Sequence, residues 1–150
     1  MKLQWPTIIV TAWIVLAATV TPAKYVPASH WFEVRSVTVS DTVAGVPARI
    51  RVDRSIHQPF VGEWTVTIRQ HNEHGYAAFC SATGQVRYAP GAVIPPNADL
   101  DWWTWPTKCN LPAGRYHVDT AWQIEVAPDV VKMVTNRSNE FEVRPRIMVD

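Results

Sequence analysis

The chain has 150 residues, with 14 Lys and Arg against 13 Asp and Glu and a formal net charge of +1. It contains no block of like charge, which argues against nucleic-acid binding through a basic face, because phosphate contacts need clustered cations. Its 47% apolar content and eight tryptophans argue against intrinsic disorder. Twelve prolines against six glycines favour many short elements with rigid connections over a helical bundle.

The first 24 residues differ from the rest of the chain. Between Lys2 and Lys24 no side chain is charged, and the run is rich in Ile, Val, Ala and Trp. About 20 residues of helix cross a hydrocarbon core, so this run is long enough to span a membrane. We therefore expect residues 1–24 to be an uncleaved membrane anchor, with residues 5–23 in contact with lipid.

A cleaved secretory signal is the competing interpretation of the same segment. Such a signal has a short basic start, an apolar run and a small-residue cleavage site, for which Thr21-Pro22-Ala23 would serve. A buried segment of a soluble domain is a third alternative. The first two place everything after Lys24 outside the cytoplasm. We expect a single-pass membrane protein with a periplasmic or extracellular carboxy-terminal domain, or alternatively a secreted one.

The two cysteines, Cys80 and Cys109, both lie in the part of the chain that would be exported. Two thiols in an oxidising compartment most often pair, so we expect a disulfide. The alternative is two separate buried thiols. A zinc site is not expected, because no CxxC and no closely spaced Cys/His pair is present.

Alternation of apolar and polar residues with a period of two predicts strands after a short stalk at residues 25–30. In residues 48–53 this pattern turns Ile50 and Val52 inward, and in residues 64–69 it turns Trp64, Val66 and Ile68 to one face. Pro and Gly mark turns between the strands. The expected β-domain covers residues 31–146, followed by a tail at 147–150, and its other strands are expected at 31–39, 75–80, 85–88, 100–105, 116–124 and 139–143.

The prediction of a β-domain rests mainly on the stretch from Leu111 to Ile124. It opens with a turn at Pro112 to Gly114 and continues as an alternating strand. One face of the strand carries Tyr116, Val118, Trp122 and Ile124, and the other carries Arg115, His117 and Asp119. We expect the second face, with His117, to lie on the surface.

This turn of Leu, Pro and Gly followed by Tyr-x-Val resembles the entry into strand F of immunoglobulin-like sandwiches. The resemblance implies an all-β, antiparallel two-sheet sandwich, in which the hydroxyl of Tyr116 bonds back to the preceding turn and Trp64 is the core tryptophan of strand C. Val118 stands where antibody domains have their second core cysteine, so the Cys80–Cys109 pair would be a different link. The chain is also loosely similar to small anchored immunoglobulin-like proteins of bacteria and tailed phages.

The segment from Asp99 to Trp105 is the densest candidate for binding. In an extended strand Trp103 and Trp105 share one face and Trp102 takes the other. An exposed tryptophan suits stacking on a sugar ring or anchoring a protein interface. The alternative is that these rings fill the core. Asp99 and Asp101 lie beside them, yet nothing in the sequence provides the environment that a general acid of a glycosidase needs.

Other chemistry has weaker support. His71 and His74 would need further ligands, such as His57 or Glu73, to hold a metal, and solvated turn residues are the ordinary interpretation. The chain has no GxSxG motif and no glycine-rich phosphate loop. We therefore expect no catalytic residue, no metal and no cofactor.

The function predicted from these patterns is non-enzymatic. We expect a membrane-anchored, exported immunoglobulin-like module that mediates protein–protein recognition at the cell envelope. Its partners would be the lipid membrane and an envelope or surface protein, with a glycan as an alternative and no nucleic acid. One rival is a carbohydrate-binding module that uses the Trp102–Trp105 cluster. Another is a structural subunit of an envelope or phage particle.

Overall fold

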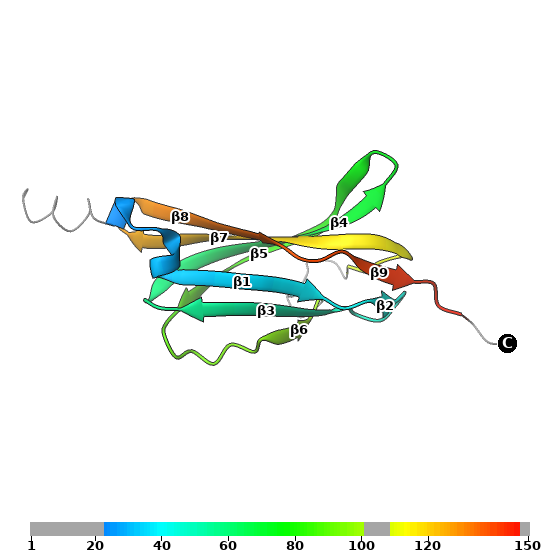
Figure 1. Ribbon diagram of the computed structural model, residues 1–150, viewed down its shortest axis with the longest axis horizontal. Coiled ribbons are helices and arrows are strands. Elements are labelled where there is room, and N and C mark those ends of the chain that lie inside the picture. Colours follow the sequence, from blue (N-terminus) through cyan, green and yellow to red (C-terminus); the bar gives the residue numbers. More distant parts are fainter. Residues whose placement is uncertain (1–22, 101–108, 148–150) are drawn as a thin grey trace, which may run out of the picture.

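The computed structural model describes residues 23–100 and 109–147. In this part of the chain two β-sheets lie face to face, and helical residues are few (Figure 1). Sheet A has the order β1–β3–β6, and sheet B has the order β2–β9–β7–β4–β5, with β8 also paired to β7. The elements are η1 (Ala28–His30), β1 (Phe32–Val39), β2 (Thr42–Val43), β3 (Arg49–Ile56), β4 (Phe60–Asn72), β5 (Gly75–Tyr88), β6 (Asn97–Asp99), β7 (Gly114–Ala127), β8 (Val130–Arg137) and β9 (Phe141–Arg144).

The expected all-β, two-sheet architecture is confirmed, and several strands differ from their predicted bounds. The two short strands expected at 75–80 and 85–88 are one strand, β5, because Ser81 to Gly84 continue the pairing with β4. Strand β8 was not predicted. Its inward positions mix Val130 and Val134 with polar residues, so it lacks a clean apolar alternation.

The core lies between the two sheets and follows the predicted alternation. On β3 Ile50 and Val52 point inward, and on β9 Phe141 and Val143 do the same. The inward face of β7 carries the predicted set, together with a buried Thr120. The largest fully buried side chains are Tyr116, Phe32, Ile50, Ile68, Ile124, Val118 and Val143.

A kink at Ser138 and Asn139 separates β8 from β9 and connects the two sheets. The Ser138 Oγ accepts a hydrogen bond from the backbone N–H of Val118 at 2.9 Å. The Asn139 side chain accepts a bond from the N–H of Val39 at 2.8 Å and donates one to the carbonyl of the same residue at 2.9 Å. The Ser138 hydroxyl thus satisfies an N–H that the break between β8 and β9 leaves without a strand partner, and Asn139 satisfies backbone groups on the free edge of β1.

Residues 1–22 of the predicted anchor (1–24) and the last residues, 148–150, lie outside the described residues. The predicted stalk at residues 25–30 is described, and η1 within it lies against β1 and β8. Just before the stalk, the carbonyl of Lys24 accepts a hydrogen bond from Lys132 Nζ at 2.5 Å. Among the residues described, no helix combines the length and the apolar character needed to cross a membrane.

Candidate functional site

The predicted aromatic site cannot be placed. Asp101 and the three clustered tryptophans (102, 103 and 105) lie outside the described residues. Asp99 ends β6, where its backbone pairs with Arg49 of β3, but its side chain is not described. Carbohydrate binding by this cluster therefore stays a prediction.

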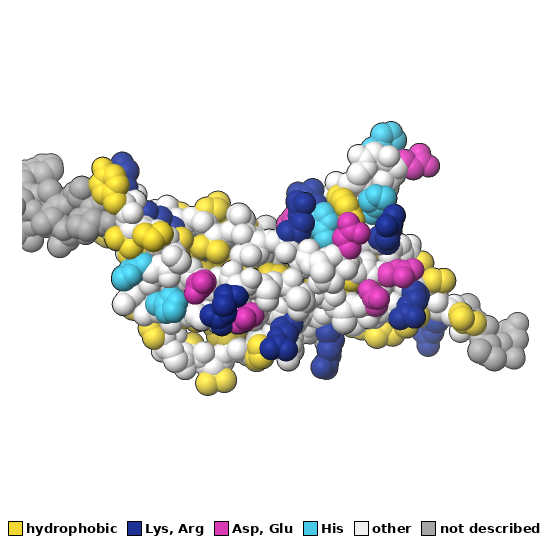
Figure 2. Space-filling model, viewed as in Figure 1, with side chains coloured by type: hydrophobic (Ala, Val, Ile, Leu, Met, Phe, Trp, Pro, Cys, Tyr) yellow, Lys and Arg dark blue, Asp and Glu magenta, His cyan; other side chains and the backbone are white. Residues whose placement is uncertain are grey.

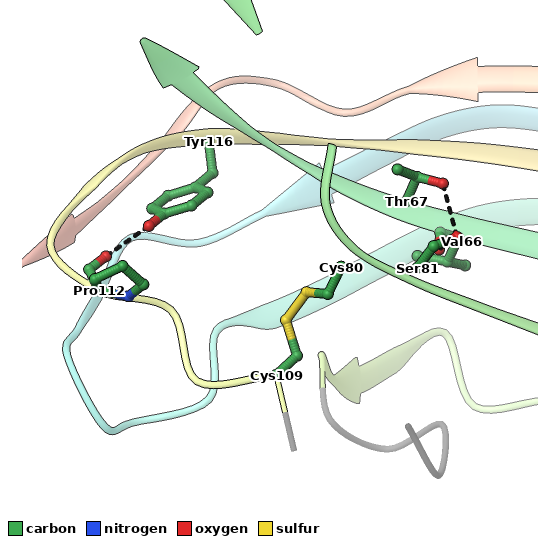
Figure 3. Close-up of a disulfide and its surroundings, with 7 residues drawn as sticks. All are labelled: Val66, Thr67, Cys80, Ser81, Cys109, Pro112 and Tyr116. Carbon is green, nitrogen blue, oxygen red and sulfur yellow. Dashed lines mark hydrogen bonds between the residues drawn. A yellow bond between two sulfur atoms is a disulfide. The ribbon is translucent and has the colours of Figure 1, made fainter. Parts of the chain in front are cut away.

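The predicted disulfide between Cys80 and Cys109 is present (Figure 3). It joins β5 to the segment that leads into β7, across a Cα–Cα distance of 6.3 Å and a sequence separation of 29. Both cysteines are half-buried and pack against the core. The bond therefore holds the segment before β7 against β5.

At the start of β7, Tyr116 is completely buried and makes the hydrogen bond that the resemblance implies. Its hydroxyl donates to the carbonyl of Pro112 at 2.8 Å, within the turn that precedes the strand (Figure 3). Its ring stacks on Phe141 of β9, with centroids 5.8 Å apart. The bond holds the turn against the end of the sandwich.

The tryptophan assigned to strand C is only half-buried. Trp64 lies in β4 and faces inward, packed against the core. Its register partner on β7, Trp122, is 4% exposed and is the tryptophan fully enclosed between the described parts of the two sheets. Both tryptophans border a cavity between the two sheets.

A charged cluster on the outer face of sheet B joins three strands through one carboxylate. Asp119 of β7 accepts a hydrogen bond from Arg69 Nε of β4 at 2.6 Å and another from Arg137 Nε of β8 at 2.8 Å. Burial alone would raise the pKa of Asp119, yet the bonds from the two arginines hold it below its usual value. The carboxylate is thus a fixed anion that ties β4, β7 and β8 together.

The expectation that His117 lies on the surface is wrong. Its side chain does leave the outer face of β7, yet the residue is only 2% exposed. Tyr76, from the β4–β5 hairpin, covers the imidazole edge-on at a centroid distance of 4.3 Å. The Nε2 atom is 3.4 Å from Asp119 Oδ1 and has no hydrogen-bond partner within the described chain. The hairpin therefore encloses a residue that strand alternation alone assigns to solvent.

Burial makes the imidazole of His117 harder to protonate. The pKa of His117 is lowered because desolvation disfavours the imidazolium, and this outweighs the opposing attraction of Asp119. Histidine in an unfolded chain has a pKa of about 6.5, so below that pH the unfolded chain binds a proton at this position more readily than the folded chain does. The free energy of unfolding therefore decreases as the pH drops below about 6.5. The positive charges of Arg137 and Arg69 act in the same direction.

We expect the free energy of unfolding to decrease between about pH 7 and pH 5, and His117→Gln to flatten this dependence, because glutamine does not titrate. The measurement is urea unfolding across that pH range. His74→Gln, at the exposed hairpin tip, is the control and should retain the wild-type slope. A slope that is the same in all three proteins would contradict the assignment to His117.

The β4–β5 hairpin projects beyond the sandwich (Figure 1). Charged and histidine side chains gather around it (Figure 2). A bulge opposite Ile68 and Arg69 leaves Phe79 as an extra residue of β5, and this residue is 41% exposed. Strand β5 pairs with β4 alone among the described strands, so it is an edge of sheet B. Two features that suit contact with a partner, a free strand edge and an exposed aromatic ring, thus lie on one element.

No family model, curated protein or solved structure matches this chain. The imidazoles predicted as turn residues lie in or beside the hairpin, where His71 packs on Tyr76. Within residues 23–100 and 109–147, no group of three or more His, Cys, Asp or Glu is arranged to hold a metal ion.

Proposed function

We propose that this sandwich is an immunoglobulin-like domain. Its pairing order supports the proposal, because β5, β4 and β7 correspond to strands C′, C and F of that fold, and β8 and β9, which both pair with β7, together correspond to strand G. The order β1–β3–β6 corresponds to A, B and E. The bond between Tyr116 and Pro112 occurs at the start of β7, where the family has its corner tyrosine.

We further propose that the domain is exported, held to a membrane through residues 5–23, and recognises another protein at the cell envelope. The disulfide is the observation that carries export, because structural disulfides persist in oxidising compartments and are rare in the cytosol. Recognition is supported by β5, an edge strand of 14 residues next to the projecting hairpin. An edge strand can accept a partner strand through its free backbone groups.

Cell fractionation with mass determination of the amino terminus tests export and anchoring. We expect the chain in the membrane fraction after a carbonate wash, with an uncleaved leader and with Cys80 and Cys109 unreactive to thiol reagents until a reductant is added. Free thiols in natively isolated protein would contradict export. Release by carbonate without detergent would instead favour a subunit of an envelope or particle assembly.

Recognition is tested by a photo-crosslinking amino acid placed at Gln85 of β5 in intact cells. Gln85 is exposed on sheet B, and Thr38, exposed on β1 of the other sheet, is the matched control position. We expect one discrete crosslinked protein from position 85 and none from position 38. The same products from both positions, or none from either, would contradict recognition through β5.

A further inference from the structure

A cavity of about 600 Å³ lies between the inner faces of the two sheets. It exists because, in the described chain, sheet A has three strands and sheet B has six. The inner face of β5 therefore has no strand opposite it, and the connection containing Ile94, Pro95 and Pro96 forms the other wall. Val86 faces inward in β5, opposite Gly62, yet it is 44% exposed. The space is thus open to solvent along the β5 edge.

Trp64 forms part of the cavity wall and packs closely against β5. Its indole lies against the backbone of Gly84 on the neighbouring strand, so closely that a Cβ at Gly84 would be 2.4 Å from Cζ2 of the ring. Only glycine accommodates this approach without displacing the ring. The ring therefore lies along the wall of the cavity with Val66, and most of the remaining lining is aliphatic.

One cation borders this apolar space. Arg54 continues the inward series of Ile50 and Val52 on β3, so its side chain leaves the strand on the core side and lines the cavity. Burial lowers the pKa of Arg54, because desolvation disfavours the guanidinium ion. By contrast, Arg35 pairs with Asp53, and Arg69 and Arg137 pair with Asp119. No carboxylate of the described chain lies within ion-pair distance of Arg54.

A half-buried cation without an acid partner is costly unless an anion reaches it. Ligand pockets of about 300–1,000 Å³ are mostly apolar and contain a few polar groups that orient the ligand. We propose that this cavity binds a single-chain aliphatic carboxylate, with the hydrocarbon chain between the sheets against Trp64 and the carboxylate paired with Arg54. A guanidinium ion can hold a carboxylate through two parallel hydrogen bonds. Inward side chains of β5, among them Val86, line this cavity, whereas the recognition proposed above uses the backbone edge of β5 and the hairpin.

The test uses the full-length chain in lipid nanodiscs and a 12-carbon fatty acid with a photoreactive group near the end of its chain. We expect crosslinks in the peptides that line the cavity, around residues 50–54, 84–88 and 93–98. Unlabelled fatty acids should compete about fourfold better for each added methylene until the cavity is filled, the factor that corresponds to about 0.8 kcal/mol per buried methylene. The methyl ester of the probe should label at least about tenfold less, because it lacks the charge.

Arg54→Met keeps the aliphatic stem and removes the charge, and it should reduce labelling by the acid about tenfold or more while leaving labelling by the ester unchanged. Arg51→Met is the matched control, since Arg51 lies on the same strand, points outward and is exposed. Val86→Glu, at a half-exposed position on the cavity wall, should also reduce labelling by the acid through repulsion. Thermal unfolding verifies that each variant is folded.

Three results would overturn the proposal. Crosslinks confined to residues 5–23 would indicate contact with bulk lipid only. Equal losses in Arg54→Met and Arg51→Met would indicate general attraction to a cationic surface. Absence of labelling in the folded wild type would indicate that Arg54 serves another purpose, such as preventing association through an inward-pointing charge. None of these results bears on the crosslinking test at Gln85.

Discussion

Replacing Cys80 and Cys109 together by serine is expected to lower the free energy of unfolding by about 3–4 kcal/mol. The disulfide closes a loop with a sequence separation of 29 and so restricts the unfolded chain, and a loop of that length corresponds to this figure in the chain-entropy account. For a domain of this size, the loss lowers the melting temperature by about 10 °C. Thermal and urea unfolding of the wild type and the double variant measure it.

Reduction of the wild type gives an independent measurement of the same bond. Dithiothreitol should lower the melting temperature of the wild type to that of the double serine variant and leave the variant unchanged. Ser81→Ala, next to Cys80 on the exposed face of β5, is a control for local disturbance of the strand; it removes the hydroxyl bonds to Thr67 and to the carbonyl of Val66 and should cost about 1–2 kcal/mol, less than the double serine variant. A double variant as stable as the oxidised wild type would show that the link does not restrain the unfolded chain.

Truncation of Tyr116 to alanine is expected to cost about 3–5 kcal/mol, the range for removing a fully buried aromatic ring. Tyr116→Phe keeps the ring and its stacking on Phe141 but removes the bond to the carbonyl of Pro112, and this should cost about 1 kcal/mol. The difference between the two variants separates packing from hydrogen bonding. Urea unfolding measures both.

The control for the hydroxyl is Tyr25→Phe. Tyr25 is 78% exposed, so loss of its hydroxyl should leave the stability within about 0.5 kcal/mol of the wild type. If Tyr116→Phe behaves like this control, the bond to Pro112 contributes nothing net, and the turn before β7 is held by packing alone. That result would also weaken the comparison with the corner tyrosine of immunoglobulin-like domains.

Alternation along single strands was sufficient to predict the core face of the domain. Ile50 and Val52, or Tyr116 and Val118, lie two residues apart, and strand geometry places such residues on one side whatever the strand pairs with. The disulfide was predictable for a related reason, because the chain contains only two cysteines. These features depend on residue type and spacing, which are read directly from the chain.

Continuity of strands was harder to predict, because it depends on pairing partners. Ser81 to Gly84 are polar or small and interrupt the apolar pattern of β5, yet the ladder with β4 continues through them. Strand β8 likewise exists through its pairing with β7, although Lys132 occupies an inward position of it. Backbone hydrogen bonds to a neighbouring strand supply what the local pattern lacks.

Two features depend on the tertiary structure alone: the burial of His117 on the outer face of sheet B, and the surroundings of the charged Arg54 on the inner face of sheet A. Alternation assigns His117 to solvent, but the projecting hairpin places Tyr76 over it. Conversely, Arg54 occupies an inward position that ordinarily carries an apolar residue, and it lines a cavity because no strand of the described chain stands opposite β5. Periodicity predicts on which side of a strand a side chain lies. What covers that side is determined by segments distant in the chain, whose packing no local spacing encodes.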